Sequence, residues 1–335
     1  MDKRQLKVNV LFGGDSTERD VSIASAAQVV KALRERSHRV KAIDTLVGLL
    51  GPEEEQQLFT RSVAMTPPSK KDQGLESVLT WLNNPQLLDA DLWFIALHGG
   101  AGEDGRWQGL LAMTGIPYTG SAVLGSALAM DKDMTKRLLR QAGIPTPHWL
   151  MAPVTAADVE QHLGWPVVVK PSKQGSTVGL SVVRHPGKLA EAIALAKEHD
   201  DEVMVEQFIR GRELTCPVLQ NRALPVGEII LKHGEVFDYE AKYQPGGAEE
   251  VFPAVLDNRI VDQVQNLALQ IHQVLKLTGY SRSDFRLDDQ GRAWCLEVNT
   301  LPGLTAMSLL PQSAQVAGIS FAELIEHICF AAVSA

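Results

Sequence analysis

The sequence lacks two features that would assign it at once to a broad class of proteins: a membrane-spanning run and a positive charge balance. No stretch of about 20 consecutive apolar residues occurs, so we expect no transmembrane helix. The 40 acidic residues outnumber the 32 basic ones and give a net charge of −8. We therefore expect no general attraction to nucleic acid or to anionic membranes, and any bound phosphate must be held by a local site.

Cysteine is scarce, with three residues in a chain of 335. Cys216, Cys295 and Cys329 lie far apart and match no metal-ligand spacing, so we expect buried free thiols. An odd number of cysteines fits a reducing compartment. The first residues place basic side chains before a short apolar run that ends at Gly13-Gly14 without a small-residue cleavage pattern, which indicates a first strand rather than a signal peptide. Together these features predict a cytoplasmic protein.

The composition that is present is ordinary for a globular enzyme, with 45% apolar and 21% charged residues, and the length suggests two or three domains. Apolar runs that alternate with a helical pattern at Ser22–Arg34 predict a parallel sheet covered on both faces. The residues of 49–75 are rich in Pro, Glu, Gln, Ser and Lys and predict a loose connection or a weakly packed excursion. The predicted strands of this first region are Val8–Phe12, Val40–Ile43 and Leu92–Leu97.

The composition changes after Gly120. Residues 124–142 predict one helix, which Gly143 and Pro145 end. Two further helices are expected near 259–277 and 320–333. The predicted strands, mostly antiparallel from Leu214 onward, are Pro166–Lys170, Gly179–Val183, Val203–Phe208, Pro225–Ile230, Phe285–Leu287 and Ala293–Val298. This order indicates an N-terminal α/β domain followed by a small and then a larger α+β domain.

A set of oxygen donors stands out near the C-terminus. Asp284 belongs to a short strand, and a Gln-Gly turn separates it from a second strand that carries Glu297 and Asn299. Because side chains two apart on a strand share a face, these groups can converge, and hard oxygen donors suit Mg²⁺. The same alternation places Cys295 on that face and turns Leu296 towards the core. The alternative is a solvated polar face on a hairpin.

A Gly- and Ser-rich turn between two strands, Lys170 to Gly179, offers a possible phosphate site. Backbone N–H groups of such a loop can hold phosphate oxygens, Ser176 and Thr177 add hydroxyl groups, and Lys170 adds a positive charge. This loop contains neither the GxxxxGK[ST] pattern nor a GxGxxG fingerprint, which excludes two common nucleotide-binding motifs for it. A plain flexible turn is the alternative.

Two further regions carry weaker signals. The strand and glycine turn of Val205–Glu213 are compatible with a nucleotide site, in which the backbone at the strand edge would bind adenine and a carboxylate would bind the ribose hydroxyls. The alternative is a domain hinge. Loops that follow buried strands carry Glu18 and His98, and ligands of open α/β sheets bind at that end of the strands. For His98 a structural role is the alternative.

Taken together, these motifs closely resemble the D-alanine–D-alanine ligases of the ATP-grasp superfamily. Each block is weak to moderate alone, but their order is specific and covers nearly the whole chain. The resemblance implies a three-domain ATP-grasp fold of α/β and α+β type, with domains at 1–121, 122–206 and 207–335. The matching blocks are LFGGDSTERDVS, LHGGAGEDGRWQGLL, GIPYTGSAVLGSALAMDKDMTK, VVVKPSKQGSTVG, VEQFIRGRELT, DYEAKY, SRSDFRLD and LEVNTLPGLTAMSLLP.

The resemblance also implies roles for individual residues. For ATP, the phosphates would contact Lys132 and Lys170, the adenine would contact Glu206, Gln207 and Ile209, and the ribose and remaining nucleotide would contact Glu213 and Lys242. Two Mg²⁺ or Mn²⁺ ions would be held by Asp284, Glu297 and Asn299. The first D-alanine would contact Glu18 and His98, the second would contact Ser308 and Leu309, and the oxyanion would contact Arg282 and the backbone of Gly303. A hydrogen-bonded set that joins three domains over the site would consist of Glu18, Ser176 and Tyr243.

The activity implied by the resemblance is ATP-dependent joining of two D-alanines through a D-alanyl phosphate, for peptidoglycan precursor synthesis. Glu240-Ala241-Lys242-Tyr243 resembles the form of this segment that accompanies dipeptide rather than ester formation. A relative that uses D-serine or D-lactate as second substrate, and a non-enzymatic nucleotide-binding protein on the same scaffold, are the alternatives. The family also implies a homodimer.

Overall fold

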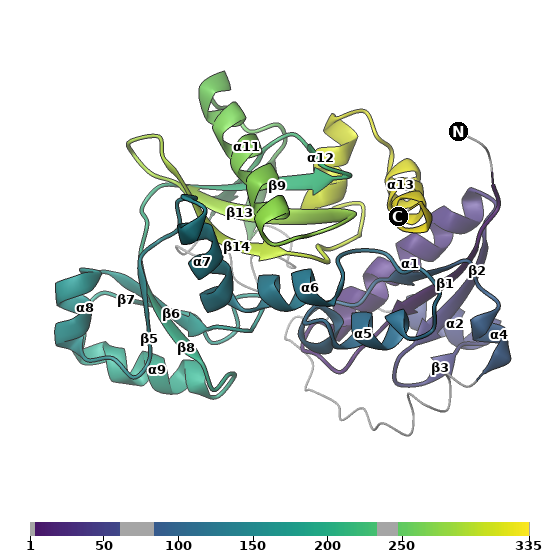
Figure 1. Cartoon of the computed structure of the whole chain (residues 1–335), viewed down its shortest axis with the longest axis horizontal. Helices are drawn as coiled ribbons and strands as arrows, with labels where there is room; N and C mark the ends of the chain where they lie inside the picture. The colour runs from purple at the N-terminus through teal and green to yellow at the C-terminus, as the bar shows by residue number, and fades with distance from the viewer. Residues whose placement is uncertain (1–3, 61–83, 233–246, 335) are drawn as a thin grey trace.

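The computed structural model describes residues 4–60, 84–232 and 247–334 of the chain. Within these residues the strands form three separate sheets, and Figure 1 shows them as three groups, each accompanied by helices. Each sheet has its own hydrophobic core. The mixed α/β and α+β architecture expected from the sequence is confirmed.

The first sheet has the strand order β3-β2-β1-β4. Strand β1 (Lys7–Phe12) pairs in parallel with β2 (Arg39–Asp44) and with β4 (Leu92–Ile95), as the uninterrupted apolar runs predicted. A two-residue strand, β3 (Gly48–Leu49), adds antiparallel to the edge of β2 and was not predicted. The glycine-rich loops after β1 and β4 therefore emerge at the same edge of this sheet.

The helices of the first sheet come from both ends of the chain. Helix α1 (Arg19–Glu35) packs on β1 and β2, and α13 (Phe321–Val333) packs on α1 and β4. Leu324 and Ile328 of α13 are buried in the same core as Val10 of β1. The last helix of the chain thus completes the first domain's core. The remaining helical segments of this region are α2 (Pro52–Phe59), α4 (Pro85–Leu88), η1 (Gly100–Gly102) and α5 (Arg106–Ala112).

Helix α2 lies inside the segment 49–75, for which the sequence predicted a loose connection or a weakly packed excursion; it has no buried residue and fits the second alternative. Pro52 stands at the first helical position, where its missing N–H costs nothing, and the Glu54 carboxylate accepts from the Gly51 N–H at 2.8 Å. The acidic composition that suggested a loop instead suits a helix N-terminus. Residues 61–75 lie outside the described part of the chain.

The single helix predicted over 124–142 is two helices, α6 (Val123–Met130) and α7 (Lys132–Gln141). Asp131 leaves the helical conformation, and its carboxylate accepts from the Met134 N–H at 3.0 Å. Aspartate competes well for this N-cap position, which explains the break inside a helical pattern. The predicted end is confirmed: Gly143 adopts a positive φ, and the Ile144 N–H donates back to the Leu139 carbonyl.

The second sheet is antiparallel, in the order β5-β8-β6-β7. Its strands are β5 (Trp149–Met151), β6 (Val167–Pro171), β7 (Ser181–Val183) and β8 (Val203–Gln207). Its helical segments are α8 (Ala156–His162), η2 (Pro186–Lys188) and α9 (Leu189–Lys197). The side chains of Val167, Val169 and Val205 face the core, so the alternate residues Val168, Lys170 and Glu206 face the opposite side of the sheet.

The third sheet is also antiparallel, in the order β12-β11-β9-β13-β14, with β10 paired to β9. The strands are β9 (Arg212–Leu219), β10 (Arg222–Ala223), β11 (Gly227–Leu231), β12 (Ala248–Val251), β13 (Tyr280–Leu287) and β14 (Ala293–Asn299). The predicted helices near 259–277 and 320–333 are confirmed as α11 (Asn258–Val274) and α13. Helix α12 (Leu309–Val316) precedes α13.

The core of the third sheet includes Leu139 of α7 and Ala129 of α6 beside Ala268 of α11. Helices α6 and α7 thus pack with α11 against the third sheet, although they belong to the range 122–206. The division at 121 and 206 stays a prediction.

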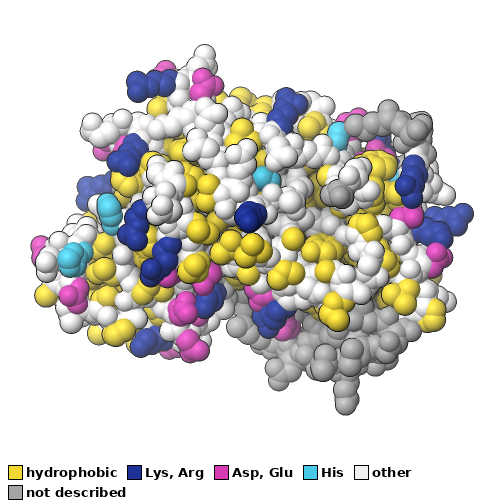
Figure 2. Space-filling view, viewed as in Figure 1, with side chains coloured by type: hydrophobic (Ala, Val, Ile, Leu, Met, Phe, Trp, Pro, Cys, Tyr) yellow, Lys and Arg dark blue, Asp and Glu magenta, His cyan; other side chains and the backbone are white. Residues whose placement is uncertain are grey.

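The predicted burial of the thiols is confirmed: Cys216, Cys295 and Cys329 are all buried and free. Among the described helices, no single one is long and apolar enough to cross a membrane. Taken together, α12 and α13 reach the required length and composition, but the chain bends sharply between them. Figure 2 shows basic and acidic side chains interspersed over the visible face.

Candidate active site

The pairing of β13 with β14 contains a β-bulge that determines which side chains reach the site. Asp284 lies opposite Glu297, but the next residue, Phe285, lies opposite Cys295, so Leu296 is the extra residue. The bulge interrupts the alternation assumed from the sequence. Cys295 is 1% exposed and belongs to the core, whereas Leu296 lines a cavity, so the predicted facing of both residues is wrong.

The proposed metal ligands do share one face. The two Asp284 oxygens accept from Arg282 at 2.9 and 2.7 Å, and further donors to this carboxylate are Thr215 at 2.7 Å and the Asn299 amide at 3.1 Å. Glu297, opposite Asp284, lies 3.4 Å from the Lys132 ammonium. These contacts fix the carboxylates beside the cavity in which a phosphate would lie.

The donor set suits magnesium. Two carboxylates and an amide oxygen are hard ligands, and Mg²⁺ commonly takes one or two carboxylates together with phosphate oxygens. Among the described residues no group of three His, Cys, Asp or Glu side chains is arranged around one point, which disfavours an all-protein metal cage. The residues Asp284, Glu297 and Asn299 therefore fit an ion that is shared with a phosphate.

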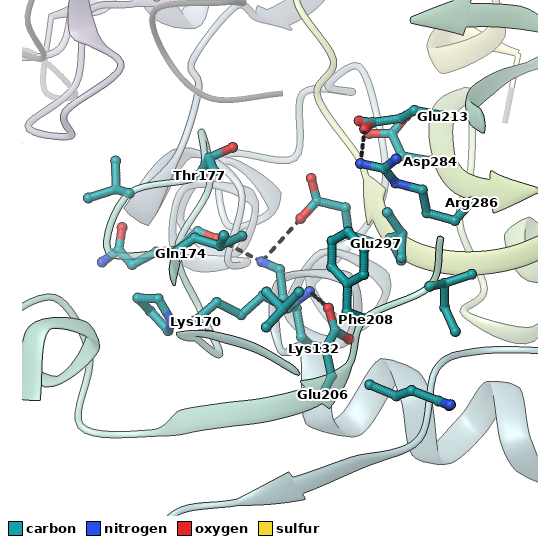
Figure 3. Close-up of a pocket in the computed structure, with 17 residues that line it drawn as sticks. Lys132, Lys170, Gln174, Thr177, Glu206, Phe208, Glu213, Asp284, Arg286 and Glu297 are labelled. Carbon is teal, nitrogen blue, oxygen red and sulfur yellow. Dashed lines mark hydrogen bonds and ion pairs between the residues drawn. The ribbon is translucent and has the colours of Figure 1, made fainter. Parts of the chain in front are cut away.

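The first cavity lies between the second and third sheets, and Figure 3 shows its polar side chains converging from both. The second sheet provides Lys170 and Glu206, and the third provides Glu213, Asp284 and Arg286. The cavity is lined by Lys132, Val168, Lys170, Pro171, Gln174, Thr177, Val178, Leu180, Glu206, Gln207, Phe208, Ile209, Glu213, Asp284, Arg286, Leu296 and Glu297. It brings together the described residues that the sequence assigned to ATP and two of the three assigned to the metal.

Each of these charged groups has a defined partner. Lys132 begins α7 and donates to the Gln174 carbonyl at 2.7 Å, so its ammonium lies between that carbonyl and Glu297 (Figure 3). Glu213 pairs with Arg286 at 2.8 Å. Apolar walls and paired charges make this a preorganised site for a polyanion that carries an apolar ring.

Glu206 is held by two lysines. Its carboxylate pairs with the Lys170 ammonium on one oxygen and lies 3.0 Å from the Lys136 ammonium on the other. Burial alone would raise the pKa of Glu206, but the two ammonium groups outweigh it and lower the pKa. Burial lowers the pKa of Lys136, and Glu206 opposes that shift.

The Gly- and Ser-rich segment is the hairpin loop between β6 and β7, as predicted. Ser176 and Thr177 adopt positive φ values of 52° and 63°, which non-glycine residues rarely do. In this conformation the Ser176 hydroxyl donates to the Glu18 carboxylate, and the Gln174 carbonyl accepts from Lys132. The loop therefore separates the first cavity from a second one and contacts both.

The second cavity lies between the loops of the first sheet and the segment that joins β14 to α12. It shares Lys132, Gln174 and Glu297 with the first cavity. It is lined by Glu18, Val21, Ala24, His98, Gly99, Glu103, Ala129, Met130, Lys132, Gln174, Gly175, Ser176, Glu250, Arg282, Glu297, Val298, Asn299, Thr300, Leu301, Pro302, Gly303, Thr305, Met307, Ser308 and Leu309. All described residues that the sequence assigned to the two amino acids line this cavity.

His98 is buried with both ring nitrogens engaged. Nδ1 donates to the Leu301 carbonyl at 2.9 Å, because a carbonyl can only accept, and Nε2 contacts the Ser25 hydroxyl at 2.8 Å. Burial lowers the pKa of His98, although Glu18 opposes this. A neutral His98 therefore links the first sheet to the segment after β14.

Glu103 was not assigned a role from the sequence. It is partly buried, its carboxyl accepts from the Gly99 N–H at 2.9 Å, and desolvation together with Glu18 raises its pKa to about 8. A neutral carboxyl here can donate a hydrogen bond, which an ionised one cannot. The sequence signal was its place in the loop after a buried strand.

The segment after β14 ends at α12, whose N-cap position is Ser308. The free N–H groups and dipole at a helix N-terminus favour a carboxylate, and both Ser308 and Leu309 face the second cavity. Gly303 packs against Ser308 so closely that a Cβ atom there would lie 2.8 Å from the Ser308 hydroxyl. A glycine at this position leaves its backbone accessible to a ligand.

Two residues with assigned roles, Lys242 and Tyr243, lie outside the described residues. Lys136 and Arg286 were not identified from the sequence, although both contact residues that were. Lys136 follows Lys132 by four positions, which places both on one helix face, and that spacing was the available signal.

Comparison with known proteins covers the chain from end to end. Residues 7–121 match the family described as D-ala D-ala ligase N-terminus, and residues 138–329 match D-ala D-ala ligase C-terminus. A D-alanine–D-alanine ligase of Gloeobacter violaceus is 40% identical over 328 residues, covering 96% of this chain and 98% of the relative.

Solved structures agree with the sequence relatives. A D-alanine–D-alanine ligase of Bacillus anthracis complexed with ATP is 31% identical, with a TM-score of 0.78 and coverage of 99% of this chain and 98% of the other. The VanG D-Ala:D-Ser ligase of Enterococcus faecalis is 30% identical, with a TM-score of 0.79 and coverage of 97% and 98%.

Agreement over the full length in both sequence and structure places the chain among the ligases that have the ATP-grasp fold. Both of its halves match one family within that class. The chain belongs to the D-alanine–D-alanine ligase family.

Proposed function

We propose that this protein joins two D-alanines into D-alanyl-D-alanine, with ATP consumed and a D-alanyl phosphate as intermediate. The observation that carries the proposal is the junction of the two cavities at Lys132, Gln174 and Glu297. A nucleotide in the first cavity would direct its terminal phosphate towards an amino acid in the second. Proximity of the two reactants then replaces a bimolecular encounter.

In the first cavity the adenine would lie between the apolar walls beside Gln207 and Ile209, with Glu206 at its edge and Glu213 at the ribose. Lys132 and Lys170 would contact the phosphates. Two Mg²⁺ ions, held by Asp284, Glu297 and Asn299, would neutralise the charge that the transferred phosphoryl group develops. Lys242 is proposed to contribute on resemblance alone.

In the second cavity Glu18 would bind the ammonium of the first D-alanine, and its hydrogen bond from Ser176 holds the carboxylate in position. His98 would lie beside this amino acid. Phosphorylation converts the carboxylate oxygen into a good leaving group. The amine of the second D-alanine, whose own carboxylate would contact Ser308 and Leu309 at the start of α12, then attacks the acyl carbon.

The attack creates an oxyanion. Arg282 and the backbone N–H of Gly303 are proposed to stabilise it. The cationic lining, including Arg282, also favours the neutral form of the attacking amine. Water must be excluded from the acyl phosphate, and the loop of residues 172–179 is positioned to do so because it contacts Glu18 on one side and Lys132 on the other. Tyr243 is proposed to join Glu18 and Ser176 in this closure.

The reaction is tested by phosphate release with ATP, Mg²⁺ and D-alanine, with L-alanine as control. We expect release and a dipeptide product with D-alanine alone. No release with D-alanine would overturn the proposed reaction. Omitting Mg²⁺ and restoring activity with Mn²⁺ tests the metal requirement.

D-serine is the second candidate for the acceptor, because a structure of similar fold is a D-Ala:D-Ser ligase. A panel of D-alanine, D-serine and D-lactate as second substrate separates the two. We expect the dipeptide D-alanyl-D-alanine to dominate. We further propose a cytoplasmic homodimer with domains at 1–121, 122–206 and 207–335, and sedimentation of the purified chain tests the dimer.

A further inference from the structure

A buried lysine that the reaction does not use lies directly behind the first cavity. Lys136 is 1% exposed, on the second turn of α7. Its ammonium donates to the Thr146 hydroxyl at 2.7 Å and to the Pro147 carbonyl at 3.0 Å, and it lies 3.0 Å from the Glu206 carboxylate. Two of the three ammonium N–H groups thus donate hydrogen bonds to Thr146 and Pro147, and the contact with Glu206 is an ion pair. A lysine is rarely buried so completely without a specific partner.

The partners of Lys136 fix it between two sheets. The Thr146 hydroxyl donates onward to the Cys295 carbonyl at 2.9 Å, and the Cys295 N–H donates to the Pro145 carbonyl at 2.9 Å. Cys295 borders the bulge in β14, while Glu206 belongs to β8 of the second sheet. The ammonium is therefore tied to both walls of the first cavity and has little freedom to move.

The position of Lys136 bears on a conflict at Lys170. In this structure the Lys170 ammonium pairs with Glu206, and both residues line the first cavity, so a phosphate bound there would compete with the Glu206 carboxylate for that ammonium. An ionised carboxylate that is left buried without a counterion is strongly disfavoured. If the Lys170 ammonium moved to a phosphate, Glu206 would still be paired with Lys136. Without Lys136, Glu206 would hold Lys170 back.

We propose that Lys136 is a positioning residue for nucleotide binding: it neutralises Glu206 permanently and so frees Lys170 for the ATP phosphates. This inference rests on the proposed role of the first cavity as the ATP site. Lys136 acts through Glu206 and does not touch the nucleotide. Its loss should therefore affect ATP and leave the amino acid sites nearly unchanged.

The test is a double-mutant cycle on the full chain, measured by calorimetric titration with ATP and Mg²⁺ and by the KM for each substrate. We expect Lys136→Met to weaken ATP binding about tenfold or more, with the KM for D-alanine changed less than about twofold. With Glu206→Gln already present, the same substitution should change ATP binding less than about twofold, because no carboxylate then retains Lys170.

The matched control is Arg137→Met, which removes the neighbouring cation on α7, whose side chain is 55% exposed and pairs with Asp133. It should bind ATP like the original chain. If Lys136→Met does not fold, Lys136→Gln removes the charge and keeps hydrogen-bond donors, and it replaces Lys136→Met throughout the cycle.

The outcomes distinguish a failure of the proposed role of Lys136 from a failure of the proposed ATP site. If the original chain fails to bind ATP, the proposed nucleotide site is wrong. Two results would overturn the inference when the original chain binds ATP. In the first, Lys136→Met binds ATP as well as the original chain does. In the second, Lys136→Met weakens ATP binding by the same factor with and without Glu206→Gln, which would mean that Lys136 does not act through Glu206.

Discussion

The carboxylates of the first cavity pair with cations, whereas those that line only the second cavity are held by neutral donors. In the first, Glu206 pairs with two lysines and Glu213 pairs with Arg286. In the second, Glu18 accepts from the Ser176 hydroxyl, Glu103 from a backbone N–H and Glu250 from the Gln312 amide. Burial raises the pKa of both Glu103 and Glu250.

This difference matches the two kinds of ligand. A nucleotide brings several negative charges, so its site needs cations that are already placed and carboxylates that are already neutralised. An amino acid brings its own ammonium, and a carboxylate bound only by neutral groups can accept it without first giving up a salt bridge. Lys132 and Glu297, which line both cavities, lie where the two requirements meet.

The largest effect is expected at Glu297, which lines both cavities and therefore falls on neither side of the contrast between them. Glu297→Gln removes the carboxylate that both cavities share, and the loss of charge stabilisation at the transferred phosphoryl group should lower kcat about 10²–10³-fold. Phosphate-release kinetics measure this. Glu160→Gln, on the exposed surface of α8, is the control and should retain full activity. A fall of less than about fivefold in Glu297→Gln would exclude Glu297 from the reaction.

The next effect concerns the buried, neutral character of the second cavity. The pKa of Glu103 is raised from about 4.5 to about 8, so between these values the folded chain keeps a proton that the unfolded chain has released. Raising the pH through this window therefore favours unfolding, by at most about 1.4 kcal/mol per pH unit. Glu103→Gln removes the titratable carboxyl group and keeps an oxygen that can accept from the Gly99 N–H.

Urea unfolding between pH 5 and pH 8 measures this effect of Glu103. We expect the stability of Glu103→Gln relative to the original chain to increase steadily as the pH rises. Parallel pH dependences for the two proteins would show that Glu103 is ionised in the folded protein. Glu103 would then no longer support the contrast between the two cavities.

A smaller effect is expected at the loop that contacts both cavities. Ser176→Ala removes the hydroxyl that donates to Glu18, and a hydrogen bond to a charged group contributes about 1.5–3 kcal/mol. We expect kcat/KM for D-alanine to fall at least about tenfold, with ATP binding altered less. An equal loss for both substrates would indicate that Ser176 supports the loop as a whole rather than Glu18.

The smallest effect concerns the helix that presents Lys132 to both cavities. Asp131→Ala removes the N-cap of α7 and should lower the free energy of unfolding by about 1 kcal/mol. Asp131→Asn keeps a capping oxygen and serves as the control. Thermal unfolding of the two variants checks the difference, and identical midpoints would mean that the cap contributes nothing to stability.

The sequence predicted the parallel sheet and several of the antiparallel strands because uninterrupted apolar runs and alternating patterns follow directly from which faces are buried, but it did not predict β9, at the centre of the third sheet. It failed where local geometry departs from strict periodicity. Leu296 is an ordinary residue, and nothing in its neighbours indicates that it is the extra residue of a bulge. Asp131 has a helical pattern on both sides, and only its capping hydrogen bond shows the break.

The site was predicted from its charged residues but not from their partners. Lys136 and Glu206 are 70 positions apart, and the pairing depends on how α7 packs beside the second sheet. Likewise, His98 Nδ1 donates to the carbonyl of Leu301, far along the chain, and Nε2 contacts the Ser25 hydroxyl of α1. Such partners are fixed by tertiary packing, which periodicity does not encode.

The position of α13 has a consequence for how the protein is synthesised. Because α13 packs on α1 and β4, the first sheet is made well before the helix that covers part of it. A fragment that ends at residue 121 would leave apolar surface of the first sheet uncovered. The nascent chain therefore has to remain soluble with that sheet incomplete until residues 321–333 have been made, which makes it a natural client for chaperones.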